Sequence, residues 1–152
     1  MKRLYVCALL MAGLVPLWAQ SAAVLDDIVA SSGVSWAQAS YLVLVASGQV
    51  DESATPEQTF EVLSQMGWAP WFTPSTAPLT EADLTWLLAR AYKLKGGLWF
   101  SLMPGPRYAF REFQFRGWVG SGRDPGALVA GNEAIRVLGK VIDATAPAGV
   151  KP

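Results

Sequence analysis

Two stretches of this chain match each other: PEQTFEVLSQMGW at residues 56–68 and PRYAFREFQFRGW at residues 106–118. With the same shift of 50 residues and no gap, the match continues, so that Leu79 falls on Val129 and Leu88 on Leu138. Each copy has the pattern of a helix, a Gly-Trp pair, a loop of about ten residues and a second helix. A repeated helix pair is typical of scaffold and binding proteins, because stacked pairs bury the apolar faces that one pair leaves exposed.

An earlier segment fits the same pattern. Val34-Ser35 and the helix after it align with Leu79-Thr80 and Val129-Ala130, at spacings of 45 and 50 residues. Residues 23–30 then form the shortened first helix of that copy. No segment shows the sustained apolar–polar alternation of a strand. The sequence therefore predicts an all-α, compact bundle of about three helix–loop–helix pairs, built as degenerate repeats of about 50 residues.

Local signals predict where the helices begin and end. Ser35 with Gln38, and Thr55 with Gln58, have the spacing of a capping box, in which each side chain satisfies an orphan backbone amide. Thr80 opens a third helix, and a glycine at Gly67 ends the second. The apolar stripe of the second helix is expected to be Phe60, Leu63 and Met66. A short helical turn is predicted at residues 98–103 and further helices at residues 107–116 and 130–143.

The N-terminus reads as an export signal. Lys2 and Arg3 precede an almost wholly apolar run at residues 6–17, and Ala19 supplies the small residue of a cleavage site. We predict a signal peptide at residues 1–19, a single helical repeat domain at 20–143 and a disordered tail at 144–152. The protein is then periplasmic or secreted, with no transmembrane segment after cleavage. The alternative is an uncleaved N-terminal anchor.

The residue types present limit the chemistry. The chain has no His, and its one Cys, Cys7, lies in the predicted signal peptide. This excludes a disulfide framework, a Ser-His-Asp triad, a thiolate nucleophile and a Cys/His zinc site in the exported chain. The carboxylate pairs Glu57/Glu61 and Glu81/Asp83 are candidates for glycosidase chemistry. Helix first turns explain three of these carboxylates better. We predict a non-enzymatic protein with no catalytic residues, metal or cofactor.

Charge is divided along the chain. Eight acidic and no basic residues lie between residues 20 and 83, whereas residues 84–152 hold ten basic and four acidic residues. Such a dipole indicates either halves that attract each other or a basic face for an anionic partner.

The densest unusual cluster is RYAFREFQFRGW at residues 107–118. Arginines interleaved with aromatic rings suit a polyanion or a sugar, since guanidinium groups bind phosphate or carboxylate and rings stack on flat faces. The alternative is a core helix with solvated arginines, and it is favoured for Phe110 and Phe113. Because the protein is predicted to be exported, nucleic acid is not expected as a partner. The candidate binding residues are Arg107, Arg111, Arg116, Arg123 and Trp118.

Two loops supply further candidates. Trp71 and Phe72 lie among prolines and have no counterpart in the last copy, so an exposed pair there would be a partner contact. Residues 120–122, Gly-Ser-Gly, could cradle an anion with backbone amides, but a turn between helices is the better interpretation. Trp118 follows a glycine stop, and such a residue commonly packs back on its own helix.

The segment GWVGSGRDP at residues 117–125, with the helix after it, resembles the S-layer homology repeat. In that family a helix leads into a Gly-rich turn, a loop and a helix opened by Thr-Arg-Ala-Glu, a position that Thr80-Glu81-Ala82-Asp83 occupies here. The resemblance implies three helix pairs around a pseudo-threefold axis and anchoring to anionic cell-wall polymers. The ligand-gripping Arg of the family is Glu81 in one copy and Gly131 in the other, so its binding residues do not carry over.

Together these patterns predict an exported, non-enzymatic binding or adaptor module of the cell envelope. Its basic–aromatic C-terminal half would dock on an anionic wall polymer or an envelope protein. The alternative is a small structural subunit that associates with itself, in which the acidic half of one copy meets the basic half of the next.

Overall fold

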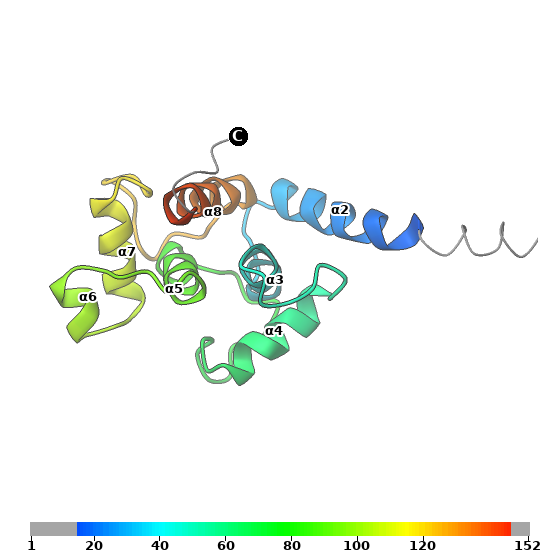
Figure 1. Cartoon of the computed structure of the whole chain (residues 1–152), viewed down its shortest axis with the longest axis horizontal. Helices are drawn as coiled ribbons and strands as arrows, with labels where there is room; N and C mark the ends of the chain where they lie inside the picture. Colours follow the sequence, from blue (N-terminus) through cyan, green and yellow to red (C-terminus); the bar gives the residue numbers. More distant parts are fainter. Residues whose placement is uncertain (1–14, 147–152) are drawn as a thin grey trace, which may run out of the picture.

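The computed structural model describes residues 15–146, and all regular structure within that range is helical. The chain contains an all-α fold, as predicted (Figure 1). Its helices in chain order are α2 (Val15–Ala30), α3 (Trp36–Ala46), α4 (Pro56–Gln65), α5 (Glu81–Ala91), α6 (Leu98–Leu102), α7 (Pro106–Phe115) and α8 (Gly131–Thr145).

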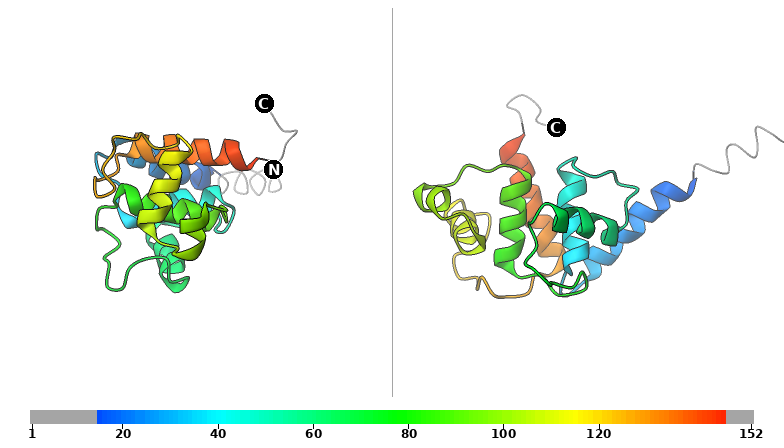
Figure 2. Two further views of the ribbon diagram at one scale, coloured as in Figure 1. Left: turned by 90° about the vertical axis from the view of Figure 1, so that its left-hand side faces the viewer. Right: turned by 90° about the horizontal axis from the view of Figure 1, so that it is seen from below.

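Three inner helices, α3, α5 and α8, pack together, and an outer helix covers each of them. The outer helix packs mainly on the inner helix that precedes it in the chain: α4 on α3, and α7 on α5. Within the described residues no inner helix precedes α2, which packs on α8 and so joins the two ends of the described chain. Figure 2 shows the inner helices between α7 on one side and α2 on the other. The helices that are consecutive in each expected pair are therefore not each other's main packing partners.

Three backbone hydrogen bonds close a ring where the inner helices begin. The amide of Val34 donates to the carbonyl of Val129 (2.8 Å), that of Leu79 to Val34 (2.8 Å), and that of Val129 to Leu79 (3.1 Å). All three side chains are fully buried. The residues are those that align at spacings of 45 and 50. The ring fixes the starting points of α3, α5 and α8 relative to one another.

The predicted caps are present. The Ser35 and Thr55 side chains each accept from the amide three residues on, and Gln38 and Gln58 complete the two capping boxes. Thr80 caps α5 in the same way through the amide of Asp83. These bonds satisfy amides that a helix start otherwise leaves unpaired.

Both outer helices of the matched stretches end alike. Gly67 and Gly117 have φ of 68° and 70°, a left-handed conformation that suits glycine. The following amides, of Trp68 and Trp118, donate back to the carbonyls of Leu63 (3.2 Å) and Phe113 (2.9 Å). This is the hydrogen bond of a Schellman motif, which turns the chain sharply at the end of a helix.

The core contains most of the expected apolar residues, with one error. Leu63 and Phe113 are fully buried, as are Leu84, Leu87 and Leu88 of α5. Met66, however, is 38% exposed. The prediction of Met66 as part of the apolar stripe was wrong. Met66 keeps helical φ and ψ as the C-cap, but at 3.6 residues per turn it lies about 120° around the helix axis from Phe60.

The termini differ from the expected boundaries. Helix α2 is continuous from Val15, eight residues before the expected start, and α8 runs to Thr145, two residues beyond the expected end. The Thr145 hydroxyl donates to the carbonyl of Val141 (2.8 Å) and holds this last turn. Most of the predicted signal peptide (residues 1–14) and of the predicted tail (147–152) lies outside the described residues. Within residues 15–146, none of the helices has the length and apolar composition that a membrane crossing requires.

Candidate functional site

A groove of about 640 Å³ lies between α7, the start of α5 and the loop before α8. One wall is α7, the other is formed by the loop, and Phe110 contributes a ring that is almost completely buried. We name it the basic groove, because three guanidinium groups line it. Its polar lining consists of Thr80, Arg107, Arg111, Gln114, Ser121 and Arg123.

Arg107 and Arg111 supply the uncompensated charge of the basic groove. They lie one turn apart on α7, and both side chains are exposed. Within residues 15–146 neither forms a hydrogen bond or an ion pair, since the four ion pairs found there involve other arginines. Two free guanidinium groups at the rim of a groove can bind an anion without first giving up an internal partner.

Arg123 has a different role from the one that its position in a Gly-rich loop suggested. Its guanidinium group donates to Glu81, whose side chain is fully buried, and lies 3.6 Å from a carboxylate oxygen of Glu133. The Arg123 side chain is still 44% exposed and edges the groove. It therefore joins the loop to α5 and α8 while presenting part of its guanidinium group to the groove.

Glu81 is a buried carboxylate that sequence reasoning treated as an ordinary first-turn residue. Burial raises its pKa, and the hydrogen bond and charge of Arg123 oppose that rise. Its second oxygen, Oε2, is buried without a partner. One sequence signal could have indicated the burial: in the aligned copies, Trp36 and Gly131 occupy the same position, and neither is charged.

Glu133 and Arg136, both on α8, extend the Arg123–Glu81 ion pair into a larger network. Arg136 binds Glu133 through Nη2 (2.5 Å) and Nε (2.8 Å), and this hydrogen bonding lowers the pKa of Glu133. Arg136 and Lys140 also donate to the backbone at the end of α7, where Lys140 reaches the carbonyl of Gly117 at 2.9 Å. Sequence reasoning singled out none of these three residues, although they fix α8 against α7.

Gln114 shapes the loop wall of the groove. Its side-chain amide donates to the carbonyls of Gly120 (3.1 Å) and Ser121 (3.3 Å). The backbone amide of Arg123 also donates a hydrogen bond to the carbonyl of Gly120 (3.2 Å). Residues 120–122 therefore form a turn held by Gln114, in agreement with the preferred interpretation of this Gly-Ser-Gly segment. No sequence signal distinguished Gln114 from other polar residues on α7.

Arg116 and Trp118 do not line the basic groove. Arg116 binds Glu112 (2.8 Å) and the carbonyl of Lys95 (2.5 Å), and its guanidinium group lies 5.0 Å from the centre of the Trp118 ring. Trp118 in turn packs edge-on against Phe113, with ring centres 5.0 Å apart. It packs back on the helix it follows, as expected of a residue after a glycine stop. The structure therefore divides the predicted arginine cluster into a groove-lining part and a packing part.

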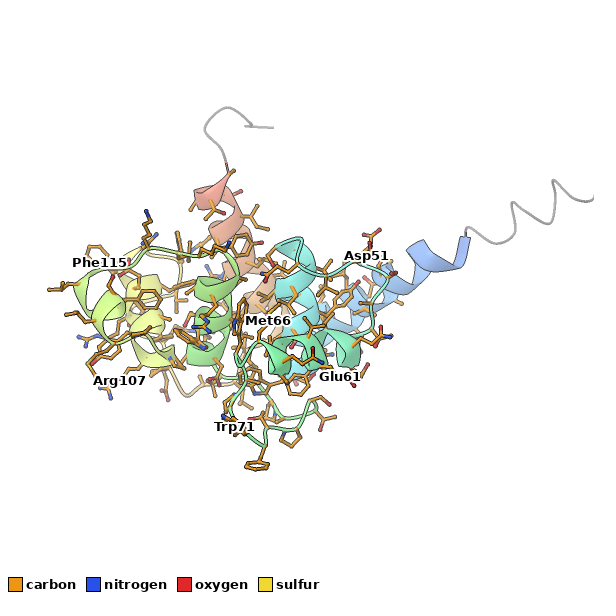
Figure 3. The ribbon with its side chains drawn as sticks, turned by 60° about the horizontal axis from the view of Figure 1, so that its bottom comes forward. Asp51, Glu61, Met66, Trp71, Arg107 and Phe115 are labelled. Carbon is orange, nitrogen blue, oxygen red and sulfur yellow. The ribbon has the colours of Figure 1, made fainter. Side chains whose placement is uncertain are left out.

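Trp71 and Phe72 are 91% and 98% exposed, so the aromatic pair that the sequence suggested does project into solvent. Their rings are 6.5 Å apart, and Phe72 has a left-handed φ of 63°. They border a separate hollow of about 230 Å³ together with Ser64 of α4. Figure 3 shows Trp71 projecting from its loop, well apart from Arg107.

The candidate carboxylate pairs have unequal surroundings. Glu57 and Glu61 are exposed one turn apart on α4. Glu81 is fully buried against Arg123, and Asp83 accepts a hydrogen bond from the Thr80 hydroxyl (2.6 Å). A carboxylate as deeply buried as Glu81 cannot reach a substrate in this conformation. Within residues 15–146, no group of three or more acidic residues could hold a metal ion.

Comparison of the chain with protein-family models, with curated proteins and with solved structures gave no match.

Proposed function

We propose that this protein is an exported, non-enzymatic binding module of the cell envelope, and that its basic groove docks on an anionic wall polymer or on an anionic surface of an envelope protein. The observation that carries the proposal is the pair of unpaired guanidinium groups, Arg107 and Arg111, on a groove of about 640 Å³. Clefts of roughly 300–1,000 Å³ are the size of typical ligand-binding sites.

The arrangement of the helices supports a second, architectural proposal. A ring of three hydrogen bonds joins the starts of α3, α5 and α8, and each of these helices carries one outer helix. We propose that the chain consists of three degenerate helix pairs related by a pseudo-threefold axis, the architecture that the resemblance to S-layer homology repeats implies. Since a fold does not determine a function, the arginines carry the functional argument.

Co-sedimentation with wall sacculi purified from its own host, at low and high salt, tests the proposal. We expect the protein to pellet with sacculi at low salt and to be released at high salt, because exposed charges are screened. Arg107→Gln with Arg111→Gln is expected to weaken binding at least tenfold, since each lost charge-assisted hydrogen bond costs about 1.5–3 kcal/mol.

A matched control removes two charges elsewhere. Lys93→Gln with Lys95→Gln changes the net charge by the same amount, and both lysines are exposed outside the basic groove. This variant is expected to bind sacculi nearly as the unaltered protein does. The proposal fails if the groove variant and the control bind equally, or if the unaltered protein stays in the supernatant.

A further inference from the structure

The two matched outer helices carry opposite charges at the same positions. A shift of 50 residues places Glu57 of α4 on Arg107 of α7, and Glu61 on Arg111. All four side chains are exposed, and within the described residues none of them takes part in an ion pair. We name Glu57 and Glu61 the acidic face, and Arg107 and Arg111 the basic face.

The two faces are presented by the same local geometry. Leu63 anchors α4 on α3, and Phe113 anchors α7 on α5, each with a fully buried side chain. Within each face the two charges lie one helical turn apart, about 6 Å along the axis. The charges of an acidic face can therefore pair, two to two, with those of a basic face on an antiparallel helix.

Within one molecule the two faces cannot meet. Figure 3 shows Arg107 and Phe115 at one end of the molecule and Glu61 on the other side of α5. The inner helices α3 and α5 lie between the two outer helices, and α4 and α7 pack on different inner helices. Any pairing of an acidic with a basic face is therefore between two molecules.

Apolar side chains border both faces. The exposed Trp71–Phe72 pair lies beside α4, since it shares a hollow with Ser64. At the end of α7, Phe115 is 89% exposed, and α6, which packs on α7, exposes Leu102. Phe72 is also held in a left-handed conformation, which is strained for a non-glycine residue, and its ring is almost fully exposed.

From these observations we propose that a second copy of this chain binds head to tail: α4 and the Trp71–Phe72 loop of one copy dock on α7 of the next. Glu57 then pairs with Arg111, and Glu61 with Arg107. Because the two faces differ, the contact is heterologous. The first copy keeps its basic face free and the second keeps its acidic face free, so each can bind a further neighbour.

This contact does not rest on the proposed function, although both use Arg107 and Arg111. A wall polymer and a neighbouring copy would therefore compete for the same guanidinium groups. Failure of sacculus binding would leave the self-association intact, and failure of self-association would leave sacculus binding intact.

Charge reversal tests the contact by sedimentation velocity over a range of protein concentrations at low salt. We expect the sedimentation coefficient of the full chain to rise with concentration. Glu57→Arg with Glu61→Arg, and separately Arg107→Glu with Arg111→Glu, are each expected to weaken association at least tenfold, because like charges then face each other. All four positions are exposed, and an unchanged melting temperature checks that both variants fold.

Mixing the two reversed variants gives the decisive result. One variant then carries arginine on both helices and the other glutamate on both, so an equimolar mixture is expected to restore association that neither shows alone. As a control, Lys93→Glu with Lys95→Glu should associate as the unaltered protein does. A monomeric unaltered protein at every concentration, or a mixture that fails to associate, overturns the proposal. So does normal association of either reversed variant.

Discussion

The α3–α4 region, with its loop at residues 67–78, and the α5–α7 region, with its loop at residues 117–128, share a frame and differ in surface. In both, a proline begins the outer helix, a large apolar residue anchors it, and a Gly-Trp pair ends it. The exposed positions between these features carry carboxylates in one region and guanidinium groups in the other. Buried and capping residues therefore set the shape, and exposed residues are free to change the chemistry.

The loops differ in how they are held. Both run antiparallel to the start of the inner helix of their own region: Trp36 of α3 donates to Ala77 (2.9 Å) in one, and Glu81 of α5 to Ala127 (2.9 Å) in the other. Of the two loops, and among the described residues, only the second is also held by side-chain hydrogen bonds, through Gln114 and through the Arg123–Glu81 pair. The first loop presents its aromatic pair where the second has Ser121-Gly122.

The largest expected effect comes from the anchors of the two outer helices. Phe113→Ala should lower the free energy of unfolding by about 4 kcal/mol, and Leu63→Ala by about 3 kcal/mol, since both leave a cavity in a packed site. Phe113 loses more because its ring is larger and also contacts Trp118. Chemical denaturation of both variants measures the difference. A larger loss at Leu63 would mean that α4, rather than α7, is the more firmly packed outer helix.

The next largest effect is expected at Gly131, at the start of α8. The aligned positions of α3 and α5 hold Trp36 and Glu81, and neither side chain would fit at Gly131. A Cβ at Gly131 would lie 1.6 Å from the carbonyl oxygen of Ile28, so Gly131→Ala must push α2 away from α8. We expect a loss of about 3 kcal/mol in unfolding free energy, typical of a severe overpacking change.

Gly139→Ala in the same helix is the matched control. A Cβ there has nothing within 4 Å, and alanine is the better helix former by about 1 kcal/mol. Thermal unfolding should therefore show a lower melting temperature for Gly131→Ala and a slightly higher one for Gly139→Ala. Equal behaviour of the two variants would show that α2 does not pack closely on the start of α8.

A smaller effect, on the pH dependence of stability, is expected from the Arg123–Glu81 pair that holds the second loop. Since burial raises the pKa of Glu81 above its ordinary value of 4.5, the folded state binds this proton more tightly than the unfolded state. The contribution of Glu81 to stability is then fully present below pH 4.5 and is lost as the pH rises through the raised pKa.

Comparison with Glu81→Gln isolates that contribution, because subtraction removes the effects of the other carboxylates. The unfolding free energy of the unaltered protein minus that of the variant should be greater at pH 4 than at pH 7. A difference that grows with pH would mean that Arg123 outweighs burial and that the pKa of Glu81 is lowered.

The smallest expected effect concerns the first loop, residues 67–78, which within the described part of the chain has no side-chain hydrogen bonds to hold it. Phe72→Gly should raise the free energy of unfolding by roughly 0.5–1 kcal/mol, since glycine adopts the observed left-handed conformation without strain and little packing is lost. Trp71→Ser, the neighbouring control, should change it little. A destabilised Phe72→Gly variant would show that the ring packs against the molecule in solution.

Much of the fold could be predicted because its signals are local. The capping boxes at Ser35 and Thr55 and the glycine stops act within one helical turn, so neighbouring residues contain all the information. Helix α7 was expected at residues 107–116 and lies at Pro106–Phe115. The extent of α2 was not predicted, because no cap marks its start within the described residues.

The candidate site depended more on contacts between distant residues. Arg107 and Arg111 could be identified from the sequence as exposed and one turn apart. The separate role of Arg116 could not, because it depends on the carbonyl of Lys95, which comes from another segment. The hydrogen bonds from Gln114 to three loop carbonyls could not be predicted either. These carbonyls lie six to nine residues further along the chain and come within reach only when the loop folds into its turn.

By itself, the sequence determined the helices, their caps and the 50-residue correspondence between two outer helices, because each depends on residue types at short, fixed spacings. Tertiary structure alone decided that α4 packs on α3 rather than α5, that Glu81 is buried, and that Arg123, 42 residues away, reaches it. The reason is physical: a helix is stabilised by hydrogen bonds within its own segment, whereas burial and ion pairing depend on which distant segments fill the same space.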